Sequence, residues 1–162
     1  NTTVVWTGFD KTVSLYGARG MRSVAETISF GQFIEWFKLM DWKAKRIYKL
    51  SGRYELTDDF VLDAPEYKDA YVFAQSEPSW LPEPLQQRLG THYLYKLRLW
   101  HMDFNLLDDF HHTLQKVYWS CSTQNIDVEH AYWKYLHDRK IVEVPRIGVK
   151  GIIAPSGEYI YE

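Results

Sequence analysis

The sequence predicts an α/β protein in which a layered sheet is flanked by helices. Short β-rich runs at residues 46–50, 70–75 and 141–144 alternate with helical patterns along the chain. Such alternation is typical of layered α/β domains. The 162 residues are enough for one domain with a hydrophobic core. Because no linker or internal repeat divides the chain, we expect a single domain over residues 1–162.

The first part of the chain is expected to form a strand, a turn and a helix. Residues 2–6 read as a strand, and glycines bound a turn at residues 17–21. Ser23 and Glu26 have the spacing of a capping box, which marks a helix start. Apolar residues at helical spacing then predict that this helix continues to about Met40.

The later part of the chain is expected to hold a loop, further strands and two helices. Residues 76–84 contain three prolines and should form a surface loop, because proline removes backbone donors. Alternating apolar residues predict a strand over residues 93–99. Helices are expected at residues 107–117 and 127–138, the second with Asp127 as its N-cap.

Composition excludes several classes of function. The net charge of -2 lacks the basic excess of a general nucleic-acid binder, so we expect no nucleic-acid partner. The single cysteine, Cys121, excludes an intrachain disulfide and a cysteine-only zinc site. No apolar run approaches the roughly 20 residues that cross a bilayer, and no signal peptide opens the chain. We therefore expect no transmembrane segment and a cytoplasmic location.

Residues 49–54, Lys-Leu-Ser-Gly-Arg-Tyr, are the most informative run in the chain. They follow a predicted strand, and ligands of open α/β sheets collect beyond the carboxyl ends of strands. The cations Lys49 and Arg53 suit an anionic group such as a phosphate, and Gly52 allows a close backbone approach. The alternative for the two cations is an ordinary surface ion pair beside a turn.

In their order and spacing, four short motifs resemble a known family. They are a glycine-rich turn at residues 17–21 with Glu26, the run at residues 49–54, Val-Glu-His at residues 128–130, and residues 147–151 near the end. The chain is similar to the later part of a bacterial or viral nucleotide-sugar glycosyltransferase of the A-type α/β fold. The resemblance implies transfer of a sugar from a nucleotide-sugar donor to a carbohydrate acceptor, in surface polysaccharide or glycan synthesis.

Two features of the sequence depart from that family. Since the resemblance covers the later part of the family's fold, we expect the first strands, which bind much of the nucleotide in that family, to be absent or shortened. The Asp-X-Asp motif that commonly holds a divalent metal is missing, and residues 49–54 take its place. We therefore predict metal-independent activity without a cofactor, in which fixed cations neutralise the departing diphosphate.

The resemblance assigns a role to each candidate site residue. Glu129 is the expected general base and Arg53 the cation that stabilises the leaving diphosphate. The remaining candidates are expected to bind substrate, and they are Lys49, Ser51, Gly52, Tyr54, Arg19 and His130. Structural alternatives stay open: a first-turn glutamate is favoured by the helix macrodipole alone, Tyr54 can be a packed ring, and His130 can be a packed or capping residue.

A second function remains open at this stage. The same fold can serve as a non-catalytic module that binds carbohydrate or a partner protein through an aromatic surface, and aromatic residues make up 17% of the chain. Trp80, among the prolines, is a candidate platform for an acceptor sugar, or else a ring that anchors its loop.

Overall fold

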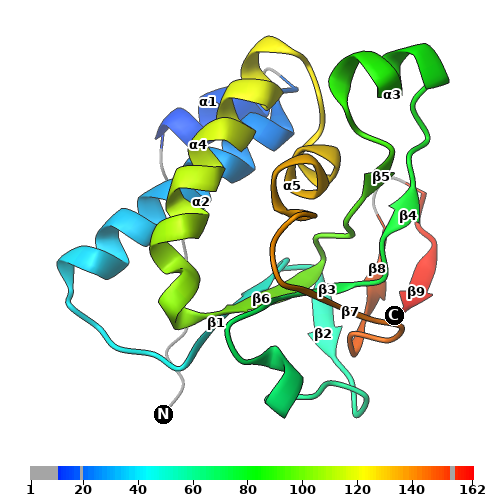
Figure 1. Ribbon diagram of the computed structural model, residues 1–162. Helices are drawn as coiled ribbons and strands as arrows, with labels where there is room; N and C mark the ends of the chain where they lie inside the picture. The colour runs from blue at the N-terminus through cyan, green and yellow to red at the C-terminus, as the bar shows by residue number, and fades with distance from the viewer. Residues whose placement is uncertain (1–10, 19, 154–155) are drawn as a thin grey trace.

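The computed structural model describes residues 11–18, 20–153 and 156–162. The protein has a mixed α/β fold, as the sequence predicts (Figure 1). The helices are α1 Lys11–Ala18, α2 Arg22–Leu39, α3 Glu83–Leu89, α4 Leu107–Thr123 and α5 Val128–Leu136, with short 3-10 turns at Pro65–Tyr67 and Phe104–Leu106. The strand predicted at residues 2–6 lies outside the described residues.

The main sheet has four strands in the order β1-β6-β3-β7. Its strands are β1 Arg46–Leu50, β3 Tyr71–Ala74, β6 Leu99–Asp103 and β7 Ile141–Val144. β6 is antiparallel to both β1 and β3, whereas β3 and β7 are parallel. It follows that β1, β3 and β7 run in the same direction, so their carboxyl ends share one edge of the sheet. The strands predicted at residues 46–50, 70–75 and 141–144 are confirmed.

Two smaller sheets lie beside the main one. β2 Tyr54–Leu56, β8 Val149–Ile152 and β9 Tyr159–Tyr161 form an antiparallel three-stranded sheet, and β4 Glu77–Pro78 pairs with β5 Tyr93–Leu94. Because β2 follows β1 after three residues, the loop at residues 51–53 joins the main sheet to the three-stranded one.

Helices α2, α4 and α5 cover one face of the main sheet (Figure 1). Trp100 on the central strand β6 is 1% exposed and contacts the rings of Phe30 on α2, Phe110 on α4 and Tyr132 on α5. Its neighbour His101 points to the opposite face, where its ring lies 4.9 Å from that of Tyr67. The abundant aromatic residues therefore fill the core between helices and sheet.

The capping box predicted for α2 is wrong. α2 begins at Arg22 with Met21 as its N-cap, which makes no side-chain capping bond. Ser23 already lies inside the helix, and its Oγ accepts a hydrogen bond of 3.1 Å from the Val128 amide at the start of α5. Glu26 is thereby free to pair with another element. Of the turn predicted at residues 17–21, Gly17 and Ala18 belong instead to the unpredicted helix α1, whereas Gly20 lies before α2 in the left-handed region at a φ of 76°.

The structure also corrects two predictions in the middle of the chain. The loop predicted at residues 76–84 contains β4 and the start of the unpredicted helix α3, because proline is compatible with a first helical turn. The strand predicted at residues 93–99 is divided between β5 and β6. Between them, the carbonyls of Leu97 and Arg98 accept hydrogen bonds from the Lys49 side chain and the Ser51 amide rather than from a partner strand.

Candidate active site at the carboxyl edge of the sheet

Lys49 lies at the edge of the main sheet where β1, β3 and β7 end. It is the penultimate residue of β1 and pairs across the ladder with Trp100. Residues paired across a ladder point to the same face of a sheet. Since Trp100 faces the helices, Lys49 also reaches into the helical layer, toward α2 and α5.

The Lys49 ammonium group is held by three acceptors. It donates to Glu26 Oε1 at 2.5 Å, to the Leu97 carbonyl at 2.7 Å and to Ser51 Oγ at 2.9 Å. The Lys49 side chain is 14% exposed and that of Glu26 is 39% exposed. An ammonium group has three hydrogens to donate. Direct contact between Lys49 and a phosphate would therefore require it to exchange one of these partners.

Glu129 lies in the first turn of α5, next to this cluster. The start of α5 is fixed by Asp127, whose carboxylate caps the His130 amide, and by the bond from Val128 to Ser23 on α2. The Glu129 carbonyl accepts a bond of 3.3 Å from the Tyr95 amide. The predicted N-cap Asp127 and the predicted helix α5 are both confirmed.

Burial makes the Glu129 carboxyl group a weaker acid than a solvated glutamate. Several effects together raise its pKa from 4.5 to about 7, and the loss of water around it is the largest of them. The carboxylates of Asp127 and Glu26 also raise the pKa, whereas the Glu129 amide and the Lys49 ammonium lower it. The site therefore places a carboxyl group that changes charge near neutral pH beside a fixed cation and a second carboxylate, an arrangement suited to general acid or base catalysis.

A chain of hydrogen bonds runs from Asp127 through His130 to Ser79. His130 Nδ1 lies 2.7 Å from the Asp127 carboxylate, and His130 Nε2 lies 2.9 Å from Ser79 Oγ. Burial alone would raise the pKa of Asp127, but the bonds from the His130 side chain and amide outweigh it and lower that pKa. These contacts have the order of a Ser-His-Asp triad. Here, however, Ser79 Oγ also accepts from the Leu81 amide at 3.1 Å.

The imidazole of His130 is fully buried, so it does not offer a surface to a substrate. Its ring packs edge-on against Trp80, with centroids 5.2 Å apart. The bonds from His130 to Asp127 and Ser79 consequently tie the segment that carries Trp80 to the start of α5. This geometry fits the packed-residue alternative for His130 rather than substrate contact.

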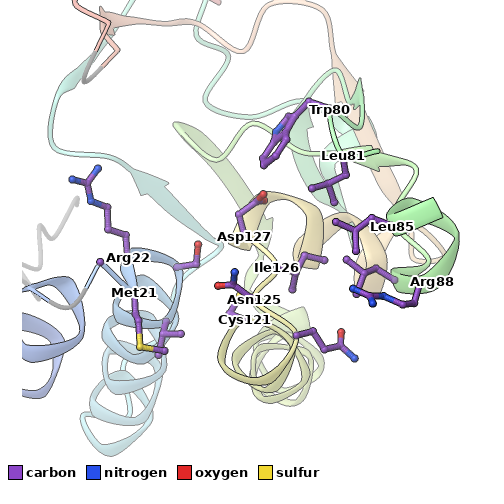
Figure 2. A pocket seen from close by; sticks show the side chains of 15 residues that line it. Met21, Arg22, Trp80, Leu81, Leu85, Arg88, Cys121, Asn125, Ile126 and Asp127 are labelled. Atoms are coloured by element: carbon purple, nitrogen blue, oxygen red, sulfur yellow. The ribbon is translucent and has the colours of Figure 1, made fainter. Parts of the chain in front are cut away.

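A cavity of about 540 Å³ opens beside the start of α5 (Figure 2). Its walls come from the beginning of α2, from the loop and helix α3 at residues 80–89, and from the turn between α4 and α5. The exposed ring of Trp80 stands on one side, and Asp127 projects from the start of α5 (Figure 2). The volume lies within the range of small-molecule sites.

The structure divides the loop at residues 49–54 between two environments. Lys49 and Ser51 belong to the cluster with Glu26. Arg53 is exposed and lines a separate shallow hollow of about 400 Å³ with Glu55, Lys150 and Tyr159 of the three-stranded sheet. Arg53 has no hydrogen-bond or ion-pair partner among the described residues.

Tyr54 and Gly52 have ordinary structural surroundings. Tyr54 is 8% exposed and packs against Gly151, where an added Cβ would lie 2.5 Å from the Tyr54 ring. This burial matches the packed-ring alternative. Gly52 does not lie in the left-handed region, and a Cβ there would meet nothing within 4 Å. Neither the turn nor its packing requires glycine at that position. Arg19 lies outside the described residues.

The site also includes two residues that sequence reasoning did not place there. Glu26 was explained by capping, and its ion pair with Lys49 joins residues 23 positions apart with no local sequence signal. Ser79 meets His130 across 51 positions. Over the part of the chain that the structure describes, no three His, Cys, Asp or Glu side chains are grouped to hold a metal ion. The metal-independent activity stays a prediction.

Comparisons with known proteins gave no match: no family model, no curated protein and no solved structure is similar to this chain. Among residues 11–18, 20–153 and 156–162, no helix combines the length and apolar character needed to span a bilayer.

Proposed function

We propose that the protein is a glycosyltransferase that moves a sugar from a nucleotide-sugar donor to a glycan acceptor. The family resemblance supports a role in surface polysaccharide synthesis. The observation that carries the proposal is Glu129. Its desolvated carboxyl group has a pKa raised to about 7 and interacts electrostatically with Lys49, which lies at the carboxyl edge of the sheet. A general base is most effective when its pKa is near the working pH.

Glu129 is the general base in this proposal. Its carboxylate takes the proton from an acceptor hydroxyl, and the hydroxyl oxygen then attacks the anomeric carbon of the donor. The bond from that carbon to the diphosphate oxygen breaks, and the nucleoside diphosphate leaves with the negative charge. We assign inversion of configuration to this step because a base on the protein activates the acceptor directly.

Lys49 acts through the carboxylates around it. Its three bonds fix Glu26, Ser51 and the Leu97 carbonyl, and its charge favours the ionised form of Glu129. Lys49 thereby opposes the rise in the Glu129 pKa that burial and Glu26 cause. This is a positioning and electrostatic role, in place of the direct diphosphate contact expected from the sequence.

Arg53 is the unpaired cation of the loop, and the proposal places the leaving diphosphate in the separate hollow that Arg53 lines. Replacing Arg53 with Ala is expected to lower kcat/KM for sugar transfer by about 10²-fold, because a charge-assisted contact to the leaving group is lost. The side chain is exposed and unpaired among the described residues, so Tm should not change. Steady-state kinetics and thermal melting check both parts. Unchanged kinetics in the variant would remove Arg53 from the mechanism.

The second candidate function is a non-catalytic module that binds carbohydrate, favoured by the exposed ring of Trp80 above the cavity. Titration calorimetry with UDP, GDP, dTDP and ADP separates the two. A transferase binds at least one of these nucleotides and turns over the matching nucleotide sugar. Failure to bind all four would contradict the transferase and support the module.

A further inference from the structure

We infer that the cavity beside α5 is an acceptor subsite for a sugar that carries an acidic group, either a carboxylate or a phosphate. The inference rests on the proposed transferase function and adds the chemical class of its acceptor. The cavity combines a flat aromatic ring, hydroxyl-binding side chains and unpaired guanidinium groups, and each of these matches one part of such a sugar.

The aromatic part of the cavity is Trp80. Trp80 is 70% exposed, although tryptophan is highly buried on average. An indole ring offers a flat apolar face to the C–H side of a sugar ring. The ring is also held in place, because the bonds among Ser79, His130 and Asp127 fix the segment that carries it. A platform fixed before binding loses little entropy when a ligand arrives.

The hydroxyl-binding part lies in the turn between α4 and α5. Gln124, Asn125 and Asp127 line the cavity there. Amide and carboxylate groups accept and donate the hydrogen bonds that sugar hydroxyls require. Asp127 is held ionised by His130, since the bonds between them lower its pKa against the effect of burial.

Two exposed arginines on opposite walls, Arg22 and Arg88, are separate candidates for holding the acidic group, because Figure 2 shows the Arg22 side chain directed away from Arg88. Arg22 opens α2 and Arg88 lies in the last turn of α3. Neither guanidinium group has a hydrogen-bond or ion-pair partner among the described residues, whereas the third basic group near this region, Lys49, is fully bonded. The guanidinium fork matches a carboxylate or a phosphate, which supports an acidic sugar over a neutral one.

A nucleotide is the competing occupant, because a base can also stack on Trp80. The amide and carboxylate groups of Gln124, Asn125 and Asp127 match the several hydroxyls of a sugar, and the acidic group is expected at an arginine, away from Asp127. We assign the cavity to the acceptor on this basis, and displacement by UDP is the outcome that tests this choice.

The test is a ligand-observed NMR titration of the whole chain with methyl β-D-glucuronide, glucose 6-phosphate and methyl β-D-glucoside. At least one acidic sugar is expected to bind about 10-fold more tightly than the glucoside, as one charge-assisted contact predicts.

Arg22→Gln and Arg88→Gln should reduce this preference for acidic sugars. Trp80→Ala should lower the affinity for all three sugars. Lys116→Gln, which removes an exposed cation on α4 away from the cavity, is the matched control and should change nothing. Equal binding of the three sugars, or a preference retained in both arginine variants, would overturn the inference.

Two further measurements test the acceptor subsite and the proposed transferase function separately. UDP added to the glucuronide complex should not displace the sugar, and displacement would assign the cavity to the donor instead. Release of nucleoside diphosphate from a nucleotide sugar, lost on replacement of Glu129, reports on the transferase alone. Turnover without a preference for acidic sugars would refute only the subsite, whereas the preference without turnover would refute only the transferase.

Discussion

Replacing Glu129 with Gln is expected to lower kcat/KM for sugar transfer by about 10²–10⁴-fold, the usual contribution of a general base. Gln has nearly the same shape as Glu and cannot take a proton from the acceptor hydroxyl. The fold should be kept, because the surroundings of Glu129 already favour an uncharged group, as its raised pKa shows. The loss should appear in the rate, without any fall in the melting temperature.

The pH dependence of the rate identifies the cause of that loss. For the unmodified protein, kcat/KM should rise with pH and level off above a midpoint near 7, because only the ionised Glu129 accepts a proton. The residual rate of the Gln variant should lack this midpoint. Glu83, an exposed glutamate in the first turn of α3, supplies the matched control, and Glu83→Gln should behave as the unmodified protein does. A Glu129→Gln protein with undiminished transfer would remove the base from the mechanism.

The same substitution is expected to stabilise the protein at alkaline pH. The pKa of Glu129 is about 7 in the folded state against 4.5 for the free side chain. Between these values the unfolded chain has lost the proton while the folded chain keeps it, so the free energy of unfolding falls as pH rises. The pKa difference between the folded and unfolded states is about 2.5. It lowers the free energy of unfolding by about 3 kcal/mol at pH 8. Gln is uncharged at every pH and avoids this loss.

Urea unfolding at pH 4 and at pH 8 measures the effect. The Gln variant and the unmodified protein should have similar stability at pH 4, and the variant should be more stable by up to about 3 kcal/mol at pH 8. Glu83→Gln should show no such change, because the Glu83 side chain is exposed. Equal effects at both pH values would mean that Glu129 is not desolvated. A group kept for function at a cost in stability is common at active sites.

The secondary structure was predictable where the pattern of residues is local and regular. The helical spacing of apolar residues predicted α2, and the short β-rich runs predicted β1, β3 and β7, since each signal lies within one element. Asp127 was recognisable as an N-cap because its bond reaches only three residues ahead. The sequence does not predict helix α3, because prolines are usual loop signals, although here they occupy positions that a first turn tolerates.

The composition of the site was predictable only in part. Lys49, Ser51 and Glu129 were singled out, and the structure brings them into one region. The partner of Lys49, Glu26, was assigned to a helix cap, because a capping spacing is local whereas an ion pair across 23 positions depends on the packing of α2 against β1.

Side-chain direction explains the remaining differences. Tyr54 and His130 were candidates for substrate contact, and the structure buries both. A sequence motif gives the order of residues but not which way a ring points, and that is decided by strands and helices brought together from elsewhere. For Tyr54 the deciding neighbour is Gly151 on β8, and for His130 it is Ser79 before α3.

The central claim is that the Glu129 carboxyl group is desolvated and titrates near neutral pH. Carbon-detected NMR of protein labelled at the glutamate carboxyl carbons measures this directly, with the Glu129→Gln spectrum identifying the resonance. A midpoint near pH 7 is expected for that carbon. A midpoint close to the ordinary value of 4.5 would contradict the claim, because Glu129 would then be a solvated first-turn glutamate that the helix dipole alone explains.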